Sequence, residues 1–174
     1  QDGDTYTRQS EAFDAFAQPT KAKRFNNIAG QAAIEEQTSY YNDLTHWVLG
    51  QPLKVVNLTT GETESQNTYN ASNATLQSRA RFGETLLNYT YDAQGQLASF
   101  TDGNAHTITL SNYRRGIPQL IHYPDNTSQS AVVDDYGEIT AVTDQAGHTT
   151  SYAYSASGWP SKITYPAGDE VSWY

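Results

Sequence analysis

The sequence predicts an all-β fold of tandem antiparallel β-hairpins, with a repeat of about 21 residues, that together form a curved sheet. Glycine recurs at a constant spacing in the second half of the chain, at Gly95, Gly116, Gly137 and Gly158. When the sequence is cut at this spacing, the copies align without gaps, and apolar columns alternate with polar ones. One column holds Phe100, Ile121, Val142 and Ile163, and the next holds Thr101, His122, Thr143 and Thr164. Such a fixed period is typical of a repeat array in which every copy turns the same face to the same core.

Each unit is expected to consist of two strands and two turns. In the unit that follows Gly95, residues 97–101 are predicted to form one strand, Asp102-Gly103-Asn104 a turn, and residues 106–112 the returning strand. Gly, Asn, Asp and Pro gather at the expected turns because they supply a positive or a fixed φ where the chain reverses. Successive hairpins are then expected to pair edge to edge.

The array is predicted to extend over the whole chain. Residues 69–73 repeat the pattern of residues 91–95, with Asn73 in the place of Gly95. Asn is the residue that best tolerates a left-handed backbone after glycine. A Gly-x-Pro segment at Gly50 matches the one at Gly158. We therefore predict degenerate repeats with an insertion over residues 1–87 and four regular repeats over residues 88–174, in one continuous array. Because the chain begins at Gln1 and contains no methionine, we expect it to be a fragment of a larger protein.

The composition argues against several classes of function. A net charge of −9 and a pI near 4.7 do not suit nucleic-acid binding, which needs a basic surface. No apolar stretch is long enough to span a membrane. Cysteine is absent, which excludes disulfides and thiolate metal sites. The hydrophobic fraction of 37% together with 13 tyrosines fits a β-sheet that has one wetted face.

The histidines are the first candidates for a chemical site. His106 and His148 occupy one column of the repeat, in which other copies have Thr127 and Asp169. A column that accepts three polar residue types indicates a turn position, and the other two histidines lack a partner at the spacing of metal ligands. Hydrolase and phosphate-loop motifs are absent as well. We therefore predict no catalytic residue, no cofactor and no metal ion.

Aspartates and aromatic residues are the remaining candidates. Aspartates at the turns are expected to accept hydrogen bonds from local backbone amides, since no EF-hand loop is present. Tyr152 and Trp173 share a column with Leu110 and Ala131 and are expected to pack inward. Trp159 directly follows a turn glycine and is the best candidate for stacking on a sugar.

Residues 89–97, which read Tyr-Thr-Tyr-Asp-Ala-Gln-Gly-Gln-Leu, and residues 142–150 resemble the Rhs or YD-repeat family. A unit of that family has a Tyr-Asp-x-x-Gly-x-Leu turn, a strand, an Asp-x-x-Gly-x-x-Thr turn and a returning strand. The resemblance is strong over residues 88–174 and weaker over about 13–87. The units of Gly116 and Gly137 lack the leading Tyr-Asp pair, which favours a turn role for that pair. The residues that this pattern assigns to the turns are Gly50, Asn73, Tyr91, Asp92, Gly95, Gly116, Gly137 and Gly158.

The resemblance implies that the sheet is a segment of a spiral β-shell. In bacterial Rhs proteins and toxin-complex subunits such repeats enclose a C-terminal toxic domain, and the animal teneurins carry a similar shell extracellularly. The implied function is a non-enzymatic shell segment that is secreted or lies at a bacterial cell surface. Its partners would be an enclosed C-terminal toxin or effector polypeptide and neighbouring repeats of the same chain. The alternative is an extracellular module that binds carbohydrate or another protein. The aspartyl self-cleavage motif of the family is absent from this sequence.

Overall fold

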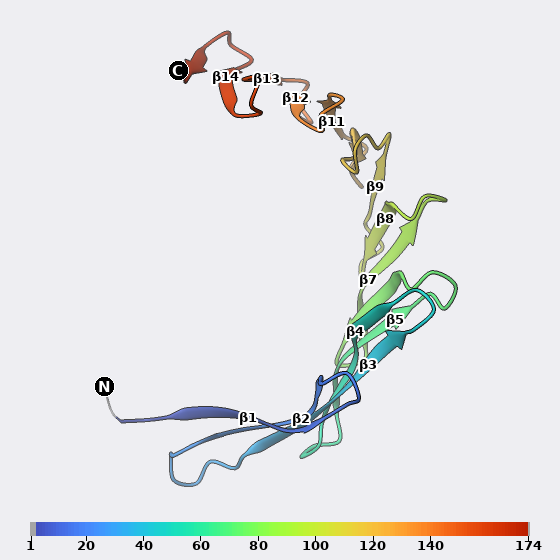
Figure 1. The fold of residues 1–174 in the computed structure, drawn as a ribbon, viewed down its shortest axis with the longest axis vertical. Helices are drawn as coiled ribbons and strands as arrows, with labels where there is room; N and C mark the ends of the chain where they lie inside the picture. The colour runs from blue at the N-terminus through green and yellow to red at the C-terminus, as the bar shows by residue number, and fades with distance from the viewer. Residues whose placement is uncertain (1–2, 174) are drawn as a thin grey trace. The chain divides into compact units, whose positions relative to one another are not determined.

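Fifteen β-strands make up the fold in the computed structural model, which describes residues 3–173. The strands follow chain order in an antiparallel sheet, and each strand between the first and the last is paired with the strand before it and the strand after it. Figure 1 shows the hairpins one after another along the chain, and the described residues contain no helix. The predicted all-β fold of tandem antiparallel hairpins is confirmed.

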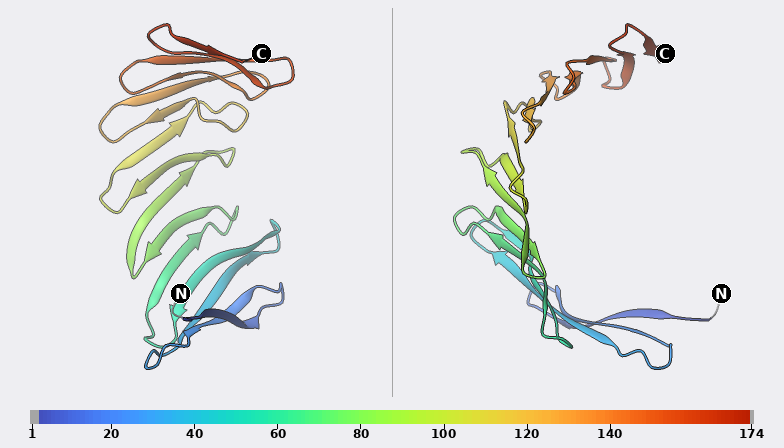
Figure 2. Two further views of the ribbon diagram at one scale, coloured as in Figure 1. Left: turned by 90° about the vertical axis from the view of Figure 1, so that its left-hand side faces the viewer. Right: turned by 180° about the vertical axis from the view of Figure 1, so that it is seen from behind.

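The contacts divide the chain into two units, Gln1–Asn88 and Tyr89–Tyr174. Within each unit, neighbouring strands are rotated relative to one another, which is the usual twist of a β-sheet (Figure 2). The first unit contains β1 (Tyr6–Phe13), β2 (Pro19–Asn26), β3 (Ile34–Asp43), β4 (Val48–Asn57), β5 (Thr63–Tyr69), β6 (Leu76–Arg81) and most of β7 (Glu84–Tyr91). The second contains the end of β7, then β8 (Leu97–Asp102), β9 (Thr107–Ser111), β10 (Leu120–His122), β11 (Ser128–Val133), β12 (Ile139–Thr143), β13 (Thr149–Tyr154), β14 (Pro160–Thr164) and β15 (Glu170–Ser172).

One turn type closes most hairpins of the second unit. At Asp92 the backbone N–H donates to the Gln96 carbonyl (2.9 Å), and the Gly95 N–H donates to the Asp92 carbonyl (3.1 Å). Gly95 has a φ of 79°, so this is a type I turn followed by a left-handed residue in a G1 bulge. The Asp92 carboxylate accepts the N–H groups of Gln94 (2.9 Å) and Gln96 (2.8 Å), as predicted for turn aspartates. The same pair of backbone bonds recurs in the turns that start at Asp102, Tyr123, Asp134, Asp144, Ser155 and Tyr165.

The left-handed residues of these turns reveal a finer period than the glycines alone. They are Gly95, Ala105, Asn126, Gly137, Gly147, Gly158 and Gly168. Gly147 lies almost midway in the chain between Gly137 and Gly158, so this repeat contains one such turn at each end of its strands. In the turn that starts at Asp102, the positive φ falls on Ala105, whereas the sequence suggests Gly103. The reason is that the G1 bulge needs the left-handed residue at the fourth position of the turn, and Gly103 occupies the second.

One of the turn residues assigned from the repeat, Asn73, lies beside the left-handed position and not on it. The left-handed residue is Ala74, with a φ of 58°. This loop is one residue longer, because the Asn70 N–H donates to the Thr75 carbonyl (2.8 Å). Ala74 therefore keeps the same spacing to Gly95 that the later glycines keep to one another. The Asn73 carboxamide instead accepts the N–H of Thr75 (3.2 Å).

Gly50 and Gly116, which were also assigned to the repeat turns, lie outside the recurrent turn type described above. Gly50 lies inside β4 and not in a turn, because the preceding turn places its positive φ (56°) at Trp47. The β3–β4 pairing shifts register beside Gly50, which has a φ of 75°, and a Cβ there would clash with the Gln18 side chain. Gly116 belongs to a tight two-residue loop, in which Arg114 and Ile117 exchange two backbone hydrogen bonds of 3.0 Å each. Both residues of this loop have a positive φ.

The two faces of the sheet in the second unit differ in chemistry. The cross-strand pairs on one face are Phe100 with Ile108, Leu110 with Ile121, Ala131 with Val142, and Tyr152 with Ile163. We call this the apolar face. On the other face, the hydroxyl oxygens of Thr101 and Thr107 lie 2.8 Å apart, as do those of Thr143 and Thr149. We call this the hydroxyl face, and the predicted alternation of apolar and polar columns is confirmed.

The buried core is small, because each unit is a single layer of strands. Among the described residues Val133 has the one large side chain that is fully buried, at 0% exposure, and Ala22 and Ala74 are also buried. Trp173, which was expected to pack inward, is 50% exposed because it follows β15, which pairs with a strand on one side only. Backbone ladders and turns therefore hold this fold more than a layered core does.

Tyrosine hydroxyls tie neighbouring hairpins together. The Tyr154 hydroxyl at the end of β13 donates to the Ile139 carbonyl at the start of β12 (2.9 Å). The Tyr113 hydroxyl donates in the same way to the Leu97 carbonyl at the start of β8 (2.6 Å). Burial raises the pKa of both tyrosines. These bonds give the recurrent tyrosines a structural role.

Removing one of these hydroxyls should destabilise the second unit. We expect Tyr154→Phe to lower the free energy of unfolding by about 1 kcal/mol, because the Ile139 carbonyl loses its side-chain donor. Urea unfolding followed by tryptophan fluorescence measures the change. Tyr136→Phe is the control, since the Tyr136 side chain is 89% exposed in a turn and should be neutral. Equal losses in both variants would contradict the assignment.

Candidate functional site

Three histidines each lie beside an aspartate within a turn. The distances between the ring Nδ1 and the carboxylate Oδ2 are 2.8 Å for His46 and Asp43, 3.1 Å for His106 and Asp102, and 3.4 Å for His148 and Asp144. In each turn the same carboxylate also accepts the backbone N–H of its histidine. The pairs are therefore local turn contacts, as predicted for the His106 and His148 column. Groups of three or more residues able to hold a metal ion are absent from residues 3–173.

Acid should weaken the fold through these turn carboxylates. Hydrogen bonds from the backbone N–H and ring of His46 hold the pKa of Asp43 at about 2, below its ordinary 3.8. Backbone N–H groups also lower the pKa of Asp102 and Asp144. A carboxyl with a depressed pKa stabilises the fold above its unfolded pKa, and this contribution is lost as the pH falls from about 4 to about 2.

We therefore expect the urea midpoint to fall across this pH window, and to fall less in Asp43→Asn, which has no carboxyl at that position. Chemical-shift titration of the Asp43 carboxyl carbon gives its pKa directly. A pKa of Asp43 at its ordinary value would contradict the prediction.

Trp159 lies where the sequence suggested, directly after the left-handed Gly158. Its carbonyl accepts the Ser155 N–H (2.8 Å), and its own N–H donates to the Ser155 hydroxyl (3.2 Å). The side chain is 73% exposed. This placement leaves the indole accessible, and its sugar-stacking role stays a prediction.

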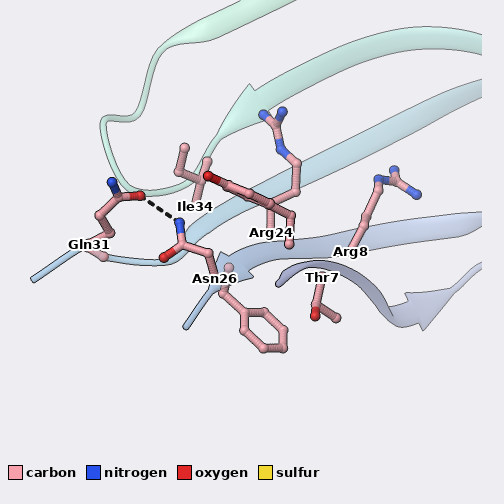
Figure 3. A pocket seen from close by; sticks show the side chains of 9 residues that line it. Thr7, Arg8, Arg24, Asn26, Gln31 and Ile34 are labelled. Carbon is pink, nitrogen blue, oxygen red and sulfur yellow. Dashed lines mark hydrogen bonds between the residues drawn. The ribbon is translucent and has the colours of Figure 1, made fainter. Parts of the chain in front are cut away.

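A hollow of about 340 Å³ lies on β1, β2 and β3. Figure 3 shows Asn26 and Gln31 turned toward one another, while Arg8 and Arg24 project from their strands. Asn26 Nδ2 donates to Gln31 Oε1 (2.6 Å), and Arg24 forms an ion pair with Glu36. Arg8 lies directly opposite Arg24 in the register of β1 and β2. The lining residues include no histidine, aspartate, glutamate or serine, and the side-chain hydroxyls among them belong to Tyr6 and Thr7.

A second hollow, of about 420 Å³, lies on β5, β6 and β7 and was not predicted from the sequence. Its lining includes Thr68, Ser78 and Phe82, and the Phe82 ring is 55% exposed. The one signal that could have pointed to it is the dipeptide Phe82-Gly83, an unusual pair for the tip of a tight hairpin.

Strands paired in chain order, closed by a recurrent turn, place this chain in the class of tandem β-hairpin repeat proteins. Within that class, residues 133–170 match the family described as the RHS repeat. The resemblance of this chain to the Rhs and YD-repeat family is thereby confirmed. No curated protein matches the chain.

Solved structures of Tc toxin proteins share the fold. The crystal structure of TcdB2-TccC3-Cdc42 is 14% identical with a TM-score of 0.65, covering 91% of this chain and 9% of that one. A structure of the Tc holotoxin pore of Photorhabdus luminescens is 13% identical with a TM-score of 0.65, covering 92% and 9%. The crystal structure of TcdB2-TccC3 is 13% identical with a TM-score of 0.63, covering 91% and 9%. At these identities the likeness shows the fold alone, and this chain spans 9% of the length of the matched chains.

The described residues include no helix with the length and apolar character needed to cross a membrane.

Proposed function

We propose that this chain is a non-enzymatic wall segment of an Rhs-type shell that encloses a C-terminal toxin or effector polypeptide. The observation that carries the proposal is the single-layer sheet of the second unit with its apolar face and its hydroxyl face. Removing apolar surface from water is favourable by about 25 cal/mol for each Å², so the apolar face is more stable where another polypeptide covers it. In a shell, the apolar face would turn toward the enclosed polypeptide and the hydroxyl face toward solvent.

The fold and the repeat support this proposal from a second direction. The RHS repeat at residues 133–170 and the likeness to Tc toxin structures fit a shell segment, and one of those structures is named as a holotoxin pore. A secreted or bacterial cell-surface location is part of the proposal. Strand pairing in chain order suits a wall, because each added hairpin extends the sheet by one further unit.

Cysteine labelling of the full-length protein tests which face is covered. The sequence has no cysteine, so single cysteines introduced at neighbouring positions of β11 report on the two faces separately. Ala131 lies on the apolar face, and Val132, the next residue, lies on the opposite face and is 54% exposed. We expect a polymer-linked maleimide to label Val132→Cys quickly in the native protein and Ala131→Cys only after unfolding in urea. Fast native labelling at both positions would overturn the proposal.

A further inference from the structure

Two arginines lie directly opposite one another in the hollow on β1, β2 and β3. Arg8 of β1 pairs with Arg24 of β2 in the strand register, and both residues are exposed. Like charges at directly opposite positions of a sheet repel each other and destabilise the strand pair. Because this arrangement costs the sheet stability, it favours a role for the two guanidinium groups in binding an anion.

The carboxylates of the neighbouring strands are engaged elsewhere and leave Arg8 without a partner. Glu36 forms its ion pair with the opposite arginine, and Glu11 and Glu35 bond to Lys21 at 3.2 and 2.9 Å. Arg8 forms no ion pair with any residue in the range 3–173. The hollow therefore keeps one uncompensated positive charge, in a chain whose net charge is −9.

The neutral amides of the lining present free donors and occupied acceptors. The Asn26 side-chain oxygen accepts the Ile28 N–H (2.9 Å), and the Gln31 side-chain oxygen accepts a bond from Asn26 Nδ2 (2.6 Å; Figure 3). The amide nitrogen of Gln31 has no acceptor in the part of the chain that the structure describes, so its two N–H groups can bond to a ligand. An anion accepts hydrogen bonds and needs no acceptor, so it matches this lining.

The charge and the shape of the lining favour a carboxylate over a phosphate. A carboxylate carries one negative charge, which matches the one uncompensated positive charge, whereas a phosphate group carries about −1.5 to −2 at pH 7. The planar guanidinium of Arg8 can bond to both carboxylate oxygens at once. Ile34 lies opposite Arg24 in the register of β2 and β3 and offers an apolar surface beside the charged groups.

The hollow is too exposed to enclose a small molecule. Sites for small molecules bury about 70–90% of the ligand surface. Here Tyr6 is 75% exposed and Ile34 is 40% exposed, so the walls cover little of a ligand that lies between them. A polypeptide can lie across the strands and gain further contacts outside the hollow.

We propose that this hollow binds an acidic polypeptide segment. The carboxylate of a glutamate or aspartate in that segment bonds to Arg8 and to the free N–H groups of Arg24, and an apolar side chain beside it contacts Ile34 and the Tyr6 ring. This site goes beyond the proposed shell function and does not depend on it.

Peptides that are blocked at both ends test the ligand. The isotopically labelled full chain is titrated with acetyl-Gly-Leu-Glu-Leu-Gly-amide, and binding is followed through the NMR signals of the backbone and of the arginine side chains. The matched peptide has glutamine in place of the glutamate and is uncharged. We expect the glutamate peptide to bind about fivefold more tightly than the glutamine peptide. Added salt should weaken its binding, because the ion pair is exposed. Inorganic phosphate and hydrocinnamate are the free-anion arms and should bind more weakly than the glutamate peptide.

Arg8→Gln separates binding from folding. It removes the uncompensated charge, so it should weaken binding of the glutamate peptide by about fivefold. It also removes the repulsion with Arg24, so the urea midpoint should stay the same or rise. Arg8→Lys keeps the charge but lacks the planar fork, and it should recover part of the binding. Arg79→Gln is the matched control, since Arg79 is exposed on β6 outside the hollow and its loss should leave binding unchanged.

Equal binding of the glutamate and glutamine peptides would overturn the proposal, and so would unchanged binding in Arg8→Gln. An equal loss in Arg79→Gln and Arg8→Gln would also overturn it, because the overall charge and not the hollow would then set the affinity. Tighter binding of phosphate or hydrocinnamate than of the glutamate peptide would assign the hollow to a free anion and contradict a polypeptide ligand. None of these results bears on the cysteine labelling of β11 that tests the shell function.

Discussion

Val133→Ala is expected to lower the free energy of unfolding of the second unit by about 2 kcal/mol. Val133 is fully buried at the end of β11, opposite Ile139, and its N–H donates to the Gln119 carboxamide (3.0 Å). The substitution removes two methyl groups from the best packed point of a sparse core. A single-layer sheet has no second layer that could move inward to fill the cavity.

The adjacent residue provides a matched control for this prediction. Val132 has the same side chain and lies in the same strand, but it is 54% exposed on the other face. Val132→Ala should cost less than about 1 kcal/mol, which reflects the lower β-propensity of alanine alone. Urea unfolding followed by fluorescence of the tryptophans compares the two variants. Losses of similar size would show that strand propensity and not burial sets the stability here.

Gly95→Ala is expected to cost about 1–2 kcal/mol, because an alanine at a φ of 79° brings its Cβ too close to the following carbonyl oxygen. A Cβ at Gly95 would meet no other atom within 4 Å, so the cost is one of backbone conformation and not of crowding. The same urea unfolding experiment measures this cost.

Gly103→Ala is the control, since Gly103 lies in the next turn and is absent from the residues with a positive φ. It should be neutral, or stabilising by about 0.4–1 kcal/mol through the lower entropy of the unfolded chain. A cost for Gly103→Ala similar to that for Gly95→Ala would contradict the assignment of left-handed positions.

The comparison of Gly95 with Gly103 shows how much of the turn chemistry could be predicted. The glycine period located Gly95, Gly137 and Gly158 correctly as left-handed turn residues. Asn73 and Gly103 lie in turns but do not take the positive φ, although Asn and Gly are the residues most suited to it; the structure places it on Ala74 and Ala105. Gly50 has a positive φ of 75° but lies inside β4, and the turn before it has its positive φ on Trp47. The position of the left-handed residue is set by which backbone carbonyl accepts the hydrogen bond that closes the hairpin. An alanine or a tryptophan takes the positive φ where that hydrogen bond requires it.

The features of the candidate sites were likewise predicted only in part from the sequence. The sequence indicated that the His106 and His148 column is a turn position, because the alternative residues in that column are visible in the sequence. It singled out Trp159 from a local pattern, a tryptophan directly after a turn glycine. It did not indicate the hollow at Phe82, because that lining comes from three strands and depends on a register shift between β6 and β7.

The sequence by itself determined the period, the strand content and the chemistry of each face. These are properties of single positions, and side chains in a strand alternate between faces whatever the strand pairs with. The tertiary structure decided which residues take the left-handed backbone, which tyrosines bridge hairpins, and where a hollow opens on β5, β6 and β7. Each of these depends on hydrogen bonds or side-chain contacts between residues far apart in the chain, whose partners are fixed only when the strands have paired.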